Sequence, residues 1–206
     1  MSSIALPTVP VIADRLLPRS IATDAALVLG GALLTALFAQ IYIPLPLVPI
    51  TGQTAAVLLV GATLGASRGA LSMGLYAALG MVGLPVYSEA QGGIDVVFGP
   101  TGGYIVGFVL SAWLVGRLSE RAWDRTFLKA AATFLAGTGV TFLVGLPWLA
   151  LVAGLDLQAT LENGLYPFVL PGIVKALVVA ALLPAAWWGA DRLAARRERD
   201  AASDRD

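Results

Sequence analysis

The chain has 206 residues, of which 58% are hydrophobic and 13% are charged, and its net charge is zero. A soluble domain carries about 25% charged residues, so this composition predicts an integral membrane protein. The chain contains no Cys and no His, which excludes disulfides and thiol catalysis and removes the commonest general base and metal ligand. We therefore predict no metal site and no cofactor, and the neutral charge gives no indication of nucleic-acid binding.

The ends of the chain differ from its middle in charge. Residues 1–20 include Asp14, Arg15 and Arg19 and lack a short apolar core with a small-residue cleavage site, so we interpret them as a cytoplasmic tail and not as a signal peptide. Residues 21–190 are expected to form an all-α, polytopic membrane domain. The charged, Ala-rich residues 191–206 are interpreted as a solvated cytoplasmic tail that extends the last helix.

Six apolar segments predict a bundle of six transmembrane helices with binding loops on its outer side. In chain order they are residues 22–43, 52–67, 69–84, 101–118, 127–154 and 166–190. The second and third are shorter than a perpendicular span of about 20 residues, so we expect them to form a compact pair supported by neighbouring helices. The fifth is expected to bend near Gly145 and Pro147, because proline removes a helix hydrogen-bond donor.

Positive charge alternates along the connections between these segments. Twelve of the thirteen Lys and Arg residues lie in the two tails, at the second-to-third turn or around the fourth-to-fifth loop. The other connections carry only acidic residues, namely Glu89, Asp95, Asp156 and Glu162. Because cytoplasmic loops are rich in Lys and Arg, the pattern predicts a multi-pass plasma-membrane protein with both termini in the cytoplasm.

Lys175 is the thirteenth cation, and no other charge lies between Tyr166 and Trp188. An intramembrane cation costs roughly 2.5–3.5 kcal/mol on insertion scales, and such residues are typically functional. One interpretation is that Lys175 binds an anionic group of a ligand. The other is that Lys175, near the outer end of the last helix, extends to the lipid headgroups. The two remain open on position and composition alone.

Small residues recur at four-residue spacing in several predicted helices, and such residues allow close helix approach in lipid. They form the series Gly99, Gly103, Gly107 and Ser111, the series Gly61, Gly65 and Gly69, and on the first helix Ala22, Ala26 and Gly30, then Ala32 and Ala36. Packing within the bundle is one interpretation. The other is a docking surface for a second membrane subunit, for which the first helix is the best candidate.

The predicted outer loops are rich in Gly and Pro, over residues 44–53 and 83–104. Non-helical backbone at membrane depth is tolerated where it lines a cavity or is buried in protein. Pro100 is expected near the first turn of the fourth helix, and the free N–H groups there suit either a polar ligand group or an ordinary cap. Together with Lys175 and nearby aromatic residues, these loops predict a site for a small, partly apolar anion.

Three motifs in these loops resemble those of a known family. They read Pro49-Ile-Thr51-Gly-Gln53-Thr54, Gly83-Leu-Pro85-Val86, and Gly92-Gly93 followed by Phe98-Gly-Pro-Thr-Gly-Gly-Tyr104-Ile-Val-Gly107-Phe108. At this spacing the chain resembles BioY, the biotin-specific S component of energy-coupling-factor (ECF) transporters, from Ala25 to Trp188. The resemblance implies a six-helix membrane domain that is not an enzyme and that captures biotin from outside.

The resemblance also implies partners and site residues. The partners are membrane lipid, a transmembrane coupling subunit and two ATPase subunits, in keeping with the lack of a G-x-x-x-x-G-K-[ST] motif in this chain; delivery of biotin inward is expected to involve a rocking of the domain in the bilayer. Lys175 matches the lysine associated with the biotin carboxylate, and Ala32 and Ala36 match the pattern used against the coupling subunit. The remaining matches to binding-loop motifs are Thr51, Gln53, Gly92, Gly93, Thr101, Gly102 and Tyr104.

One position departs from the family pattern. Many relatives have an Asp three residues before the lysine, where this chain has Gly172. A carboxylate there would accept hydrogen bonds from the ureido N–H groups, and Asp95, Glu89, Glu162 or backbone carbonyls are the candidate replacements. The alternatives to biotin capture are an S component for another small anionic vitamin and a structural or assembly subunit. A membrane-embedded enzyme is disfavoured, because the chain lacks a recognisable acid–base or metal constellation.

Overall fold

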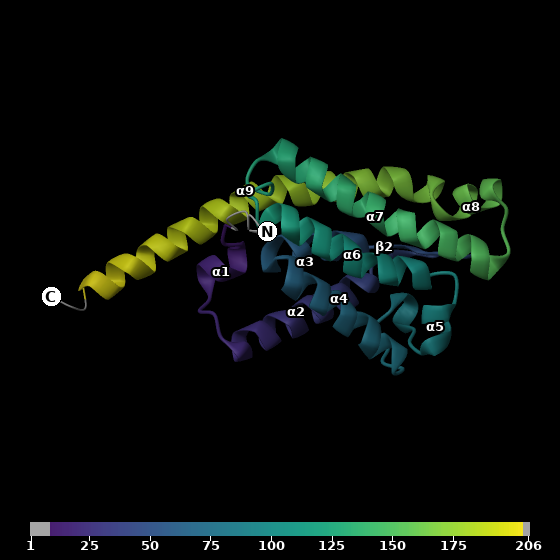
Figure 1. Cartoon of the computed structure of the whole chain (residues 1–206), viewed down its shortest axis with the longest axis horizontal. Helices are drawn as coiled ribbons and strands as arrows, with labels where there is room; N and C mark the ends of the chain where they lie inside the picture. The colour runs from purple at the N-terminus through teal and green to yellow at the C-terminus, as the bar shows by residue number, and fades with distance from the viewer. Residues whose placement is uncertain (1–8, 204–206) are drawn as a thin grey trace, which may run out of the picture.

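The computed structural model describes residues 9–203 and is predominantly helical (Figure 1). Among the described residues, four stretches are long and apolar enough to cross a membrane: Ile21–Ala39, Gly102–Ser119, Phe127–Ala153 and Leu157–Arg196. Many leucines on these helices face outward, and Leu143, Leu151 and Leu170 are 74%, 82% and 70% exposed. An outward-facing apolar surface of this extent is the surface of a protein surrounded by lipid.

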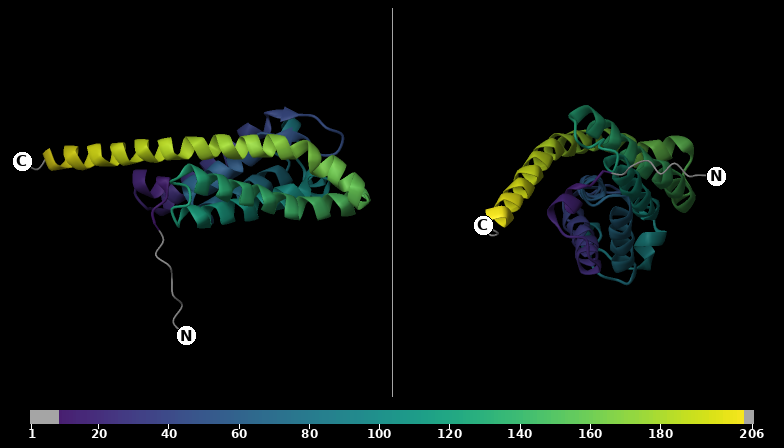
Figure 2. Two further views of the ribbon diagram at one scale, coloured as in Figure 1. Left: turned by 90° about the horizontal axis from the view of Figure 1, so that it is seen from above. Right: turned by 60° about the vertical axis from the view of Figure 1, so that its left-hand side comes forward.

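Each predicted apolar segment contains a helix whose ends lie within a few residues of the prediction, except at the C-terminal ends of the first and last of these helices. The helices are α2 (Ile21–Ala39), α3 (Gln53–Leu64), α4 (Ala66–Met81), α6 (Gly102–Ser119), α7 (Phe127–Ala153) and α9 (Tyr166–Ser203). α2 ends before the predicted boundary, and α9 continues through most of the predicted C-terminal tail and projects beyond the bundle (Figure 2). α7 includes Pro147 within one continuous helix.

Several short elements were not predicted from the sequence. They are α1 (Ile12–Leu16), β1 (Tyr42–Ile43), β2 (Ile50–Thr51), the 3-10 helix η1 (Ser88–Ala90), α5 (Ile94–Phe98) and α8 (Leu157–Gly164). β1 and β2 form an antiparallel hairpin in which Tyr42 lies opposite Thr51. The all-α prediction missed this hairpin because a two-residue strand is too short to show an alternating pattern.

Glycines on α6 allow it to pack closely against α3, α4 and α7. A Cβ atom on Gly103 would lie 2.2 Å from Cβ of Trp148, and one on Gly107 would lie 3.0 Å from Cα of Thr141. On α3, a Cβ atom on Gly61 would lie 2.7 Å from the backbone oxygen of Ala112. These series therefore serve packing within the bundle, as small residues do where helices meet in membranes.

The small residues of α2 lie on two different faces. Ala32 is fully buried and Ala36 is partly buried in the same core cluster, beside the contact of Gly31 with Ser72 of α4. The predicted docking role of Ala32 therefore needs correction, because this face of α2 is turned toward α4. The opposite face is exposed and carries small and leucine side chains, namely Ala22, Ala26, Leu29, Gly30, Leu33 and Leu37.

Charged residues gather at one end of the bundle, which we call the charged end. Asp14 of α1 accepts a hydrogen bond of 2.8 Å from Arg68 at the start of α4 and one of 2.9 Å from Arg19. Burial alone would raise the pKa of the Asp14 carboxyl, but the hydrogen bonds from Arg19 and Arg68 outweigh it and lower that pKa below 3.8. Arg15 pairs with Asp191 of α9 at 3.3 Å. The segment predicted as an N-terminal tail thus joins α4 to α9.

The loop between α6 and α7 also lies at the charged end. The Trp187 indole Nε1 donates a hydrogen bond of 2.7 Å to Oδ2 of Asp124, and the Arg125 guanidinium lies 4.0 Å from the centre of the same indole ring. Burial raises the pKa of the Asp124 carboxyl, and the hydrogen bond from Trp187 only partly opposes that rise. This loop is therefore fixed to α9 through one tryptophan.

Candidate functional site

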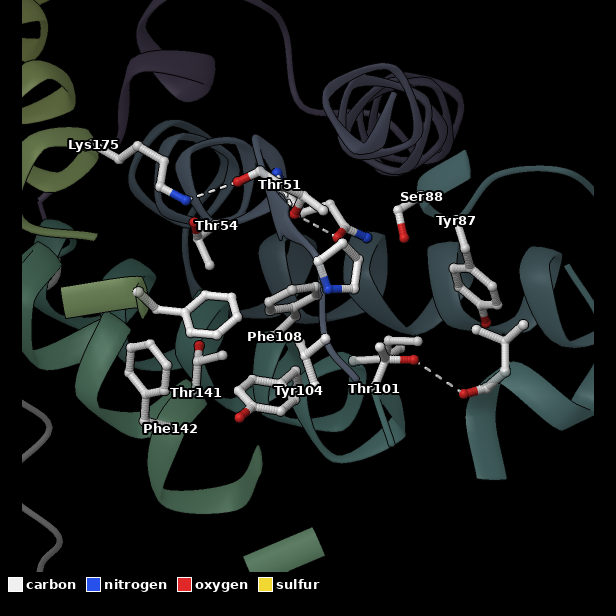
Figure 3. A pocket seen from close by; sticks show the side chains of 16 residues that line it. Thr51, Thr54, Tyr87, Ser88, Thr101, Tyr104, Phe108, Thr141, Phe142 and Lys175 are labelled. Atoms are coloured by element: carbon white, nitrogen blue, oxygen red, sulfur yellow. Dashed lines mark hydrogen bonds between the residues drawn. The ribbon is translucent and has the colours of Figure 1, made fainter. Parts of the chain in front are cut away.

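At the opposite end, which we call the loop end, the β1–β2 hairpin and the 86–101 loop lie over a cavity between α3, α6, α7 and α9. This aromatic cavity encloses about 560 Å³ including space open to solvent, within the roughly 300–1,000 Å³ of small-molecule sites. Figure 3 shows Lys175 and Thr54 at one side of it and Tyr87 and Ser88 at the other. Its aromatic lining comes from Tyr104, Phe108, Phe142 and Phe168.

Lys175 reaches the cavity from the half-buried face of α9. Its Nζ donates a hydrogen bond of 2.7 Å to the backbone oxygen of Thr51 (Figure 3). Thr54, one residue into α3, also lines the cavity, and its hydroxyl oxygen is buried without a hydrogen-bond partner among the described residues. A buried hydroxyl without a hydrogen-bond partner costs free energy. A polar ligand group that bonds to Thr54 would remove this cost, so this side of the cavity suits such a group.

Thr51 and Gln53 form a hydrogen-bonded support beneath this side of the cavity. The Thr51 hydroxyl donates to Oε1 of Gln53 at 2.7 Å, and Nε2 of Gln53 donates to the hydroxyl of Tyr76. Gln53 is 7% exposed, and Tyr76 is fully buried. Thr51 and Gln53, both predicted as site residues, line the cavity. The Gln53 amide is already hydrogen-bonded to Thr51 and Tyr76. Gln53 is therefore placed to hold Thr51, whose backbone carbonyl binds Lys175.

Tyr104 contributes its ring to the cavity and its hydroxyl to the fold. The ring centre lies 6.0 Å from that of Phe142 and 6.4 Å from that of Phe168, so side chains of α6, α7 and α9 form one aromatic wall. The hydroxyl donates a hydrogen bond of 2.9 Å to the backbone oxygen of Gly164 at the end of α8. The predicted Tyr104 thus offers an apolar face to a ligand and fixes α8 with its polar atom.

A second cavity adjoins the first at the loop end. It encloses about 830 Å³ including space open to solvent and is lined by Glu89, Gln91 and Asp95, so we call it the acidic cavity. Four residues line both cavities, namely Pro49, Ser88, Val96 and Thr101. The predicted Asp95 belongs to the acidic cavity alone, whereas the predicted Thr101 lies at the boundary, where its hydroxyl donates to the Val96 backbone oxygen at 3.3 Å.

The predicted glycines Gly92, Gly93 and Gly102 line neither described cavity. A Cβ atom on Gly92 would lie 2.3 Å from the Leu84 backbone oxygen, and one on Gly102 would lie 1.7 Å from that of Val97. Gly93 has a φ of 107°, which L side chains rarely adopt. These glycines therefore permit close backbone packing of the loop, and a direct ligand contact for them stays a prediction.

The turn at residues 87–91 separates the two cavities and is fixed on both sides. The Tyr87 ring is buried against Tyr76, with ring centres 5.4 Å apart, and its hydroxyl donates to the Ala77 backbone oxygen at 2.7 Å. Burial raises the pKa of the Tyr87 hydroxyl to about 12. From the end of α2, the Gln40 amide bonds to the backbone of Tyr87 and Ala90. Tyr87 thus anchors the turn to α4, and Gln40 anchors it to α2.

Several cavity residues were missed by the sequence analysis, including Thr54, Ser88, Phe108, Thr141, Phe142 and Phe168. Two of them carry a usable signal. Phe108 lies four residues after Tyr104, on the same face of a helix, and Thr54 directly follows Gln53 in the motif. Thr141, Phe142 and Phe168 are apolar or small residues in apolar helices, and only the packing of α7 and α9 onto α6 brings them to the cavity.

Comparison with known proteins supports this architecture. The protein named "Biotin transporter BioY" from Thermotoga maritima is 39% identical over 145 residues, covering 70% of this chain and 83% of that protein. A "Biotin transporter BioY" from Rhizobium etli is 36% identical over 167 residues, covering 73% and 88%. A "Probable biotin transporter BioY" from Pyrococcus horikoshii is 37% identical over 155 residues, covering 75% and 90%.

A solved structure shares the fold. The crystal structure of "the S-component for biotin from an ECF-type ABC transporter" superposes with a TM-score of 0.70, at 24% identity, covering 82% of this chain and 94% of that chain. The model described as the BioY family matches residues 9–192. This match includes every residue that lines the two cavities, from Leu45 to Lys175. The chain therefore belongs to the BioY family.

Proposed function

We propose that this chain is a substrate-binding membrane subunit, and not an enzyme, that captures biotin at the loop end and delivers it inward with an ATP-driven partner module. The observation that carries this proposal is the position of Lys175, whose ammonium group enters the aromatic cavity beside the Thr54 hydroxyl, which has no hydrogen-bond partner within residues 9–203. Biotin has a carboxylate, an aliphatic chain and a fused polar ring. These three parts correspond to one cationic side, an aromatic middle and a polar boundary of the cavity.

The same geometry supports one orientation of the ligand. The carboxylate is placed at Lys175 and Thr54, and the chain crosses the aromatic wall of Tyr104 and Phe142. The ring then lies on the side of Ser88 and Thr101, toward the acidic cavity. Carboxylates accept hydrogen bonds, so Asp95 or Glu89 of the adjoining acidic cavity would accept the hydrogen bonds of the ureido N–H groups, for which Gly172 has no side chain.

We also propose that six helices cross the membrane, with both termini in the cytoplasm. α3 and α4 are short, but each packs against α6, so the pair is supported by protein. Arg15, Arg68 and Arg125 all lie at the charged end, whereas the hairpin and the acidic cavity lie at the loop end. The positive-inside rule then places the charged end in the cytoplasm and the loop end outside the cell.

The proposed partners are a transmembrane coupling subunit and two ATPase subunits. The exposed face of α2, with Ala26, Gly30, Leu33 and Leu37, is the surface proposed for the coupling subunit. Nothing lies within 4 Å of a Cβ atom placed on Gly30 among the described residues, so a partner helix has room to approach there. Leucine substitution at Gly30 is expected to weaken assembly with the partner module without changing biotin binding.

The proposed function is tested by titrating biotin into the detergent-purified chain by calorimetry. Wild-type protein is expected to bind biotin, and Lys175→Ala is expected to lose about 2–5 kcal/mol, as when one partner of a buried charge pair is removed. Lys175→Arg is also expected to weaken binding, because a planar fork replaces a compact point charge. Lys129→Ala, at an exposed lysine on α7, is the matched control.

The outcomes separate the proposal from its alternatives. Tight binding that survives Lys175→Ala would keep biotin as the ligand and remove Lys175 as the carboxylate partner. Absence of binding to the wild type, in detergent and after assembly with the ATPase module, would reject biotin. In that case direct binding of another small anionic vitamin would identify a related substrate, and binding of no small molecule would favour a structural subunit.

A further inference from the structure

Gln40 connects the end of α2 to the turn between the two cavities. Its Nε2 donates hydrogen bonds to the Tyr87 backbone oxygen at 2.9 Å and to the Ala36 backbone oxygen at 3.1 Å, and its Oε1 accepts one from the Ala90 backbone N–H at 3.1 Å. One amide thus holds both sides of the η1 turn. The hydrogen bonds to Tyr87 and Ala90 depend on the length of the Gln40 side chain, because an Asn side chain is shorter by one methylene group.

The turn that Gln40 holds has an unfavourable backbone conformation. Glu89 and Ala90 have φ values of 61° and 54°, in the left-handed region that residues with a Cβ atom seldom occupy. Such a conformation persists only where surrounding contacts hold it. The Ala90 N–H that binds Gln40 belongs to one of these two residues. The Gln40 amide therefore helps to stabilise this turn, together with the backbone hydrogen bonds from Tyr87 to Gln91 and from Gln91 to Ser88 within it.

This turn also forms part of the boundary of the proposed binding site. Tyr87 and Ser88 line the aromatic cavity, and Ser88, Glu89 and Gln91 line the acidic cavity. The Tyr87 ring is anchored in the core, with 1% exposure, whereas the contact between Gln40 and Ala90 is exposed to solvent. A turn with one buried anchor and one exposed anchor opens by losing the exposed one, because water replaces those hydrogen bonds at little cost.

We propose that Gln40 is a positioning residue that holds the 87–91 turn closed over the aromatic cavity and thereby sets the rate at which the ligand leaves. This inference rests on the proposed function, since it takes the aromatic cavity as the binding site. Gln40 contacts no ligand in this account. It acts through Ser88, whose position between the two cavities depends on the turn, and its loss lets the turn move away from the ligand.

The test compares Gln40→Met, which keeps the side-chain length but removes the amide, with Gln40→Glu, which keeps the oxygen that accepts from Ala90. Gln158→Met on α8 is the matched control, because Gln158 is exposed and its side chain donates a hydrogen bond to Glu162, away from the 87–91 turn. Dissociation of labelled biotin is followed by competition with unlabelled biotin. Hydrogen exchange of the backbone amides of residues 86–93 is followed in the absence of ligand.

For Gln40→Met we expect dissociation of biotin to be about tenfold faster, with a smaller change in the association rate, since two loop hydrogen bonds are lost. Exchange at residues 86–93 is expected to rise while exchange within α6 stays unchanged, and Gln40→Glu is expected to lie between Gln40→Met and the wild type. Gln158→Met is expected to match the wild type in both measurements.

Two results would overturn the inference. Unchanged exchange at residues 86–93 in Gln40→Met would show that Gln40 does not hold the turn. Faster exchange with unchanged dissociation would show that the turn does not control release. The exchange measurement needs no ligand, so it still tests whether Gln40 holds the 87–91 turn if the wild type fails to bind biotin. Failure to bind biotin would reject the proposed function, and not the contact between Gln40 and the turn.

Discussion

The Nζ atom of Lys175 lies 2.7 Å from the backbone oxygen of Thr51, a residue 124 positions earlier in the chain. This contact joins the first third of α9 to strand β2 and fixes the ammonium group at the side of the cavity. An ammonium group has three N–H donors, so one contact with Thr51 leaves donors for a ligand. Lys175 is therefore held inside the bundle by a protein contact, and headgroup binding is not needed to account for its position.

The Thr54 hydroxyl is expected to share the ligand carboxylate with Lys175. Thr54→Val removes the hydroxyl and keeps the shape, so we expect biotin binding to weaken by about 0.5–1.5 kcal/mol, the net contribution of one hydrogen bond. Thr54→Ser keeps the hydroxyl and is expected to bind more tightly than Thr54→Val. Calorimetric titration of both variants checks the prediction. Equal affinity of wild type and Thr54→Val would remove Thr54 from the site.

Tyr104→Phe separates the two contributions of Tyr104. The ring remains in the aromatic wall, so we expect biotin affinity to change by less than about twofold, since ring contacts are retained. The hydrogen bond to Gly164 is lost, and we expect the free energy of unfolding to fall by about 1–2 kcal/mol because the carbonyl loses its partner. Titration and thermal unfolding measure the two effects. A large loss of affinity with unchanged stability would mean that the hydroxyl binds the ligand directly.

Two glycine substitutions are expected to have different effects on the free energy of unfolding. Gly103→Ala would place a Cβ atom 2.2 Å from Cβ of Trp148, so we expect it to destabilise the fold by about 1–3 kcal/mol through overpacking. Gly172→Ala meets only Cγ2 of Thr138, at 3.6 Å, and is expected to be neutral or to stabilise α9 by up to about 1 kcal/mol. Thermal unfolding in one detergent compares the two, and equal destabilisation would contradict the packing described for α6 and α7.

The ion pairs of Asp14 predict a dependence of stability on pH. Because the folded-state pKa of Asp14 is lowered below 3.8 by Arg19 and Arg68, its stabilising effect is complete well above pH 3.8 and is lost as the pH falls through the folded-state pKa. We therefore expect Asp14→Asn to destabilise the protein by about 1–2 kcal/mol at pH 7, from the loss of charged hydrogen bonds. At pH 3 the two proteins should differ less. A difference independent of pH between 3 and 7 would exclude the carboxylate as its source.

Much of the helical organisation could be predicted from the sequence, because each long helix is marked by a continuous apolar segment. The start of α6 at Gly102 and the end of α7 at Ala153 agree closely with predicted boundaries, since Gly, Pro and charge mark the ends. The hairpin of β1 and β2 and the α1 segment could not be predicted in this way. Ile12 is buried in a core cluster with side chains of α3, α6, α7 and α9, and no local pattern records such contacts.

The candidate site was predictable where a single residue type was unusual. Lys175 is one cation in an apolar helix, and the structure brings it to Thr51 of a loop motif. The α2 docking residues show the limit of this reasoning, because small residues repeat on two faces of the helix. A four-residue spacing indicates a close-packed face but cannot say which neighbour it packs against, and Ala32 packs inside the bundle.

α9 makes three of the contacts described above: Lys175 with Thr51, Trp187 with Asp124, and Asp191 with Arg15. Lys175 and Asp191 are separated by about 24 Å along a continuous helix. The amine in the cavity at the loop end and the salt bridge at the charged end therefore belong to one continuous helix. A ligand that moved Lys175 on binding would therefore act on the same helix that carries Asp191 and its salt bridge with Arg15.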